Sequence, residues 1–118
     1  MNAAGLIVVL TGVSGAVGRS FFQNLVTDGS ISQDELDGTR TMLSEAVARL
    51  KQTPQEKIEA LVAEYNEQLS GYLDKFNAGF ETETLGGFRN AQVMAGYVTT
   101  IMNKSGISKV PNLELALE

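Results

Sequence analysis

The strongest constraint on this chain is a run of large apolar side chains that recur at intervals of three and four residues. Its members are Ile58, Leu61, Val62, Tyr65, Leu69, Tyr72, Leu73 and Phe76. This spacing places them on one face of an α-helix. The residues in front of the run, Thr53-Pro54-Gln55-Glu56, form a capping box with proline at the first helical position. We therefore expect a helix from Pro54 to about Phe76, ended by Asn77-Ala78-Gly79.

Three further helices are predicted from apolar spacing and from residues that start and stop helices. Their expected ranges are 19–27, 33–50 and 85–103. Gly29 and Gly106 follow the first and third of these ranges as left-handed stops. The second follows a capping box, Ser32-x-x-Glu35, in which the serine oxygen accepts from the third backbone amide of the helix. The carboxyl-terminal segment instead alternates apolar and polar residues from 113 to 117, which is typical of a strand or an extended arm.

Residues 3–18, AAGLIVVLTGVSGAVG, carry no charged side chain and admit three interpretations. In the first, residues 6–10 are a buried strand, followed by a glycine turn and a helix. Gly12, Gly15 and Gly18 then stand in a TGxxGxxG pattern that resembles the opening of a short-chain dehydrogenase. The resemblance implies a pyrophosphate site at a helix amino terminus. The rest of the chain offers neither a second parallel strand nor a Tyr-x-x-x-Lys pair, so we do not expect a dinucleotide-binding enzyme.

The second interpretation is a helix that crosses a membrane. Sixteen uncharged residues would span about 24 Å, which is short of a hydrocarbon core of roughly 30 Å. A span over residues 3–22 reaches that length only if Arg19 extends its side chain to the interface. The third interpretation, which we favour, is a helix or a strand-turn-helix buried in the core or in a subunit contact. If residues 6–10 are a strand, the carboxyl-terminal segment is its expected partner.

Composition excludes several classes of function. The 118 residues suffice for one domain, and they include no His and no Cys. This removes imidazole catalysis, thiolate nucleophiles, disulfides and thiolate metal sites. The net charge is −5, and residues 28–83 hold twelve acidic and five basic side chains. Such an acidic surface repels phosphate, so nucleic acid is not an expected partner.

One segment resembles part of a known metal site. Residues 28–35, DGSISQDE, match the second half of an EF-hand loop. Asp28, Ser30, Ser32 and Glu35 would be the Ca²⁺ ligands. In the first half of the loop, Asn24 and Val26 stand where carboxylates belong. The same residues also fit a helix stop followed by a capping box, and we favour that explanation; no cofactor or metal is predicted.

We therefore predict one mainly α-helical domain over residues 1–118. It should be a small bundle of four to five helices, with a short two-stranded element from the two terminal segments as an option. The expected function is that of a non-enzymatic interaction or structural subunit of a homo-oligomer or larger assembly, such as a virion or phage particle, in the cytoplasm or within a soluble assembly. The candidate interface residues are Leu6, Val9, Val13, Ile58, Leu61, Tyr65, Leu69 and Tyr72.

Two alternatives remain open. One is an acidic inhibitor or adaptor that binds a basic site on a larger macromolecule. The other is a degenerate EF-hand-like module that responds to Ca²⁺. Membrane binding through residues 3–22 is a further alternative that we do not favour.

Overall fold

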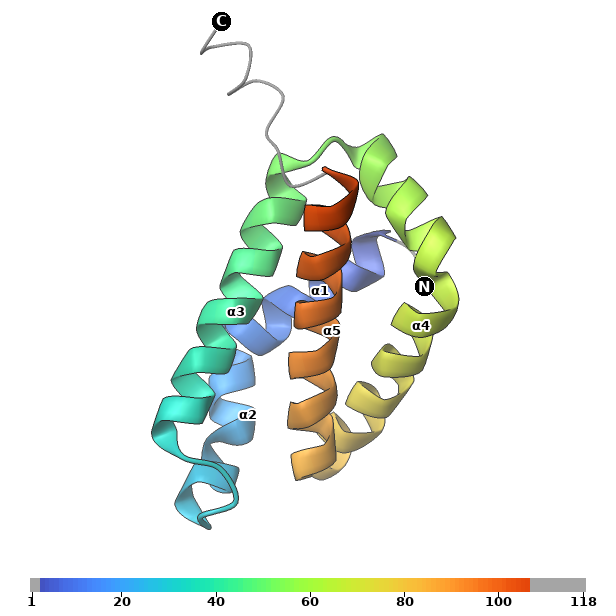
Figure 1. Ribbon diagram of the computed structural model, residues 1–118. Helices are drawn as coiled ribbons and strands as arrows, with labels where there is room; N and C mark the ends of the chain where they lie inside the picture. Colours follow the sequence, from blue (N-terminus) through green and yellow to red (C-terminus); the bar gives the residue numbers. More distant parts are fainter. Residues whose placement is uncertain (1–2, 107–118) are drawn as a thin grey trace, which may run out of the picture.

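A computed structural model describes residues 3–106 as a bundle of helices (Figure 1). The helices are α1 (Ala3–Ser14), α2 (Ala16–Thr27), α3 (Gln33–Gln52), α4 (Gln55–Thr82) and α5 (Leu85–Ser105). The predicted mainly α-helical bundle is confirmed. Within residues 3–106 there is no strand.

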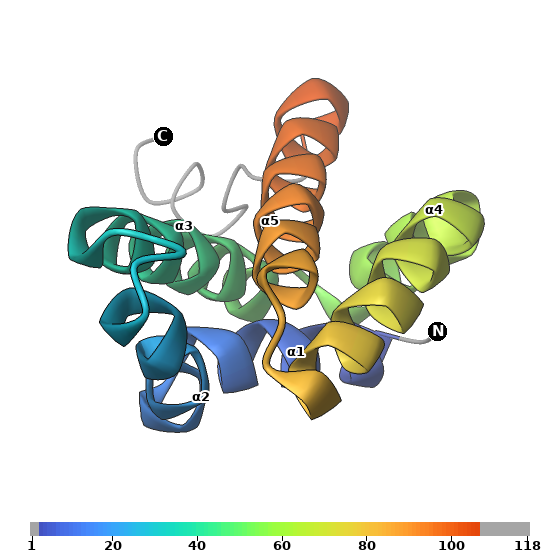
Figure 2. The same cartoon turned by 90° about the horizontal axis from the view of Figure 1, so that it is seen from below.

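Three of the helices lie side by side with α5 in the middle, between α3 and α4 (Figure 1). The first helix crosses behind them and contacts all three, and α2 continues from it along α3. In Figure 2, α1 lies on one side of the bundle and α5 on the opposite side. The core fills the space between these two layers. Its fully buried side chains include Leu6, Leu10, Phe22, Leu43, Leu50, Leu69, Phe88, Met94 and Met102.

Local signals set most helix boundaries as the sequence predicts. The Ser32 hydroxyl accepts a hydrogen bond from the Glu35 amide at 3.0 Å, so the capping box at the start of α3 is confirmed on its serine side. Gly29 and Gly106 adopt φ angles of 82° and 73°, the left-handed conformation expected of helix stops. The observed α3 and α5 each extend two residues beyond the predicted ends at Leu50 and Asn103.

The end of α4 differs from the prediction. The helix passes through Gly79 and continues to Thr82, and at Gly79 its backbone lies very close to that of Gly87 of α5. A Cβ atom on Gly79 would overlap the backbone of Gly87. The helix ends at Glu83, whose φ of 50° is left-handed, and the Asn24 amide of α2 donates to the Glu83 carboxylate at 2.7 Å. Tyr65, with φ −113° and ψ 19°, divides this long helix at a kink.

Residues 6–10 form part of helix α1, so their interpretation as a strand is wrong. A helix satisfies the backbone hydrogen bonds of this segment internally, without a neighbouring strand. It also brings Leu6, Leu10 and Val13 to one buried face, because they are spaced by four and three residues. The proposed partner strand in the carboxyl-terminal segment, residues 113–117, lies outside the described residues.

Candidate interaction surface on the first helix

The glycines of the TGxxGxxG pattern form a bend between two helices. Gly15 precedes α2 in an extended conformation, and the axes of α1 and α2 differ by 47°. At Gly18 a Cβ atom would overlap the carbonyl oxygens of Val13 and Gly12. No strand leads into these glycines, since the residues before them are helical. The pattern therefore serves a tight turn, and the resemblance to a dehydrogenase opening does not extend to the structure.

The outer side of α1 carries an apolar surface next to a hollow. Val8 is 68% exposed, compared with 46% for Val93 and 37% for Leu85 of α5. Beside it lies a hollow of about 250 Å³ between α1 and α4. Its lining residues are Val8, Val9, Gly12, Val13, Phe76, Asn77 and Phe80. We call this surface the α1 patch. None of its side chains is charged.

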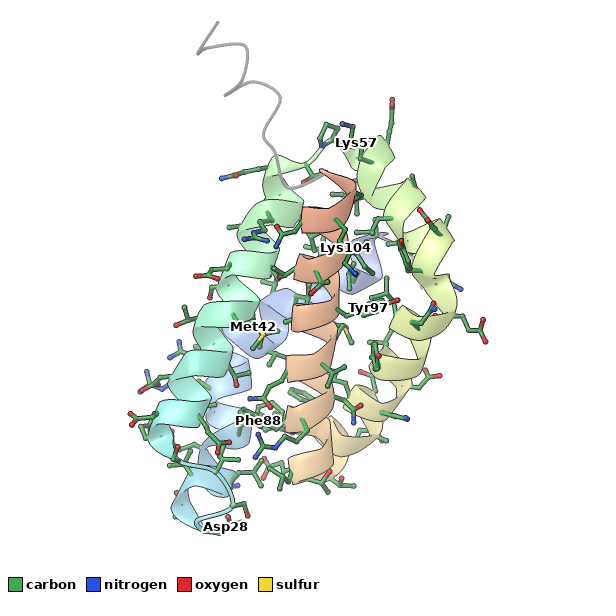
Figure 3. The ribbon with its side chains drawn as sticks, in the orientation of Figure 1. Asp28, Met42, Lys57, Phe88, Tyr97 and Lys104 are labelled. Carbon is green, nitrogen blue, oxygen red and sulfur yellow. The ribbon has the colours of Figure 1, made fainter. Side chains whose placement is uncertain are left out.

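The floor of the α1 patch is supported by stacked aromatic rings. All five phenylalanines of the chain form one connected group that joins α2, α4 and α5. Phe80 stacks on Phe21 with ring centroids 3.6 Å apart, and it contacts Phe76 at 5.1 Å. Phe88 is fully buried and labelled in Figure 3 near the middle of the bundle. These ring contacts fix the positions of Phe76, which is buried, and Phe80, which packs against the core, at the edge of the hollow.

Most of the predicted interface residues lie in the chain's own core. Leu6, Ile58, Leu61 and Leu69 are buried and therefore face no partner in this conformation. Most of the apolar stripe of α4 is covered by the other helices of the same chain. Val9 and Val13 line the hollow, although Val13 itself is only 3% exposed.

The remaining two, Tyr65 and Tyr72, are half-buried at the seam between α4 and α5. Their rings meet that of Tyr97 edge to face, with centroids 6.1 and 5.8 Å from it. Figure 3 labels Tyr97 between α5 and α4. The Glu64 carboxylate raises the pKa of Tyr65, and its burial adds to this shift. The three rings together close the seam between α4 and α5.

The EF-hand-like residues have local structural partners. The Asp28 carboxylate accepts a hydrogen bond from the Ser30 amide at 2.9 Å, and hydrogen bonding to Ser30 lowers the pKa of Asp28. Ser32 caps α3 through the Glu35 amide. Glu35 itself pairs with Arg89 at 3.2 Å, on the side of α3 that faces α5. Across residues 3–106, no three carboxylates, or other side chains of ligand type, come together in a group able to hold a metal ion.

Charge is distributed unequally over the helices. The exposed side of α4 carries six acidic and two basic residues, whereas α5 carries Arg89 and Lys104 and no acid.

Polar contacts join α3 to α5: Gln92 donates to the buried Thr39 hydroxyl at 2.6 Å, and Arg49 donates to Asn103 at 2.9 Å. A shallow dip on the outside of α3, between Asp37 and Ala48, is lined by that helix alone.

Taken singly, none of the five described helices is both long and apolar enough to cross a membrane. Helix α1 and the part of α2 from Gly18 onward would meet the requirement together by length and composition, but the pair is bent by 47°.

The interface residues predicted from the sequence include Val9 and Val13 of the α1 patch but not its other five members. Val8 was missed because it lies away from the buried face of α1. Phe80 was missed because the predicted helix ended before it. The sequence does contain a sign of the exposure of Val8. If residues 6–10 are helical, Val8 lies on the side opposite to Leu6 and Leu10.

No family model, no curated protein and no solved structure matches this chain.

Proposed function

We propose that this chain is a non-enzymatic helical subunit that joins a protein assembly through the α1 patch. The observation that carries the proposal is the exposed Val8 beside an uncharged hollow. Exposed apolar surface next to a preformed hollow is characteristic of protein contact sites. The lining of the hollow offers one polar side chain, Asn77, so its chemistry suits the burial of an apolar group.

Burial of this patch is favourable in energetic terms. Covering a valine that is largely exposed contributes about 1–2 kcal/mol, and covering the surrounding rings adds to it. Because no charge lines the patch, a partner removes water from it without the cost of desolvating an ion. An apolar side chain on a partner protein therefore fits this site better than a charged ligand does.

The proposal is tested in the cells that produce the protein. In their lysate, the wild-type chain should elute in a complex well above its own mass of 12.6 kDa. The Val8→Asp variant should elute as the free chain, because a carboxylate in the contact would lose its hydration. Val93→Asp is the matched control, since Val93 is 46% exposed on α5, on the opposite side of the bundle. A wild-type chain that elutes free in the lysate would contradict the proposal.

A second candidate function rests on the acidic outer side of α4. Six acids against two bases on exposed positions favour contact with a basic surface, as in an acidic inhibitor or adaptor. The α1 patch favours the first function, because no acidic residue lines the hollow beside Val8.

A further inference from the structure

We infer that the α1 patch is covered by the α1 patch of a second copy of this chain, related by a two-fold axis. The inference rests on the proposed function and specifies its partner. It starts from the position of a protrusion and a hollow side by side on the same face. In a two-fold contact both copies present the same surface. Each Val8 can then enter the hollow of the other copy.

The dimensions of the hollow are consistent with this contact. A volume of about 250 Å³ accommodates the isopropyl group of one valine with space to spare. Gly12 lies four residues after Val8 on the same side of α1, and a Cβ atom there would meet nothing within 4 Å. The small residue lets a second helix approach the α1 backbone closely. The helix face is therefore shaped for another helix that carries a short apolar side chain, as α1 does.

The charge distribution favours the α1 patch over the acidic faces as the surface on which two copies meet. Each chain carries a net charge of −5, so most orientations of two copies bring like charges together. Helix α1 carries no charged residue, and the first charge along the chain is Arg19. Two copies that meet through α1 keep the acidic outer sides of α4 out of the contact. The neutral patch is thus a surface on which the acidic chain can associate with itself.

The size of the patch limits the strength of the dimer. A single helix face and one hollow bury less area than the roughly 1,200 Å² of a standard stable interface. We therefore expect a reversible dimer with a dissociation constant of about 10–100 μM. Weak contacts of this kind become strong when several copies assemble side by side.

The first experiment is sedimentation equilibrium of the purified full chain over a roughly hundredfold range of concentration. The wild-type chain should pass from monomer to dimer. Val8→Asp places a carboxylate in the apolar contact, and Gly12→Leu fills the hollow; each should raise the dissociation constant at least about tenfold. Val93→Asp should leave it unchanged. Circular dichroism and thermal unfolding verify that each variant is folded, and Val8→Ala replaces Val8→Asp if that variant unfolds.

A mixing experiment distinguishes the two-fold contact from other forms of association. Val8→Ala retains the hollow and lacks the protrusion, whereas Gly12→Leu retains the protrusion and lacks the hollow. A mixture of the two should form a heterodimer more tightly than either variant forms a homodimer, because one complete contact is restored. Equal or weaker association in the mixture would overturn the two-fold geometry.

The outcomes also separate this inference from the proposed function. If the purified wild-type chain stays monomeric throughout, the second copy is not the partner. The proposed function then stands only if the complex in the lysate still depends on Val8. If the lysate also contains only the free chain, both fail. A Val8→Asp variant that dimerises as well as the wild type would overturn the inference even where a dimer is found.

Discussion

At the scale of the residue, Ser32 fixes the start of α3 through a single hydrogen bond to the Glu35 amide. The first amides of a helix have no partner within the helix, so the serine oxygen satisfies one of them. Ser32→Ala should lower the free energy of unfolding by about 1 kcal/mol, measured by urea denaturation. Ser44→Ala is the control, because Ser44 is exposed in the interior of the same helix, where alanine is favourable.

The same variant tests the two explanations of residues 28–35. If Ser32 acts as a cap, millimolar Ca²⁺ should leave the melting temperature of both the wild type and Ser32→Ala unchanged. A rise in the melting temperature of the wild type alone would mean that Ser32 also serves as a ligand.

Capping could be predicted from the sequence because it depends on two residues three positions apart. Exposure of Val8 could not be predicted with the same certainty, because it depends on which side of α1 the other helices cover.

At the scale of the element, the bend between α1 and α2 depends on Gly18. Gly18→Ala places a methyl group against the carbonyl oxygens of Val13 and Gly12, which the close turn leaves no room to avoid. We expect a loss of about 1–3 kcal/mol in the free energy of unfolding. Gly12→Ala, in the same glycine pattern, meets open space and should be neutral or stabilise the chain by up to about 1 kcal/mol. Equal losses in the two variants would contradict this account of the bend.

Contacts between helices explain where the observed helix boundaries differ from the predicted ones. Gly79 was expected to end α4 because glycine is a poor helix former. In the structure it lies inside the helix, since the neighbouring backbone of Gly87 leaves no space for a side chain. The sequence does not reveal this pairing, because it joins two helices whose angle is set by the whole bundle. The kink at Tyr65 is likewise absent from the apolar spacing, which continues through it without interruption.

At the scale of the whole molecule, the five helices use most of the apolar surface among themselves. The stripe of α4 and the inner face of α1 are both buried within one chain. Apolar spacing predicts correctly that these faces are covered. The hydrophobic effect has no direction, however, so the spacing does not indicate whether the covering residues belong to the same chain. Only the three-dimensional arrangement shows that the described residues, 3–106, leave Val8 and the adjacent hollow uncovered.

The net charge of the whole molecule gives the self-association a characteristic dependence on salt. Two copies of charge −5 repel each other at a distance, while the proposed contact would form through the α1 patch, whose lining carries no charge. Raising NaCl from about 20 mM to about 500 mM shortens the range of the repulsion and leaves apolar contacts in place. The dissociation constant of the dimer should therefore fall as salt rises, as measured by sedimentation equilibrium.

Binding through the acidic outer side of α4 to a basic partner would respond in the opposite direction, because salt screens attraction between unlike charges. The sign of the salt dependence thus distinguishes the two candidate surfaces without any substitution. A dimer that weakens as salt rises would mean that ionic contacts hold the two copies together. The α1 patch, which carries no charge, could not then be the surface that joins them.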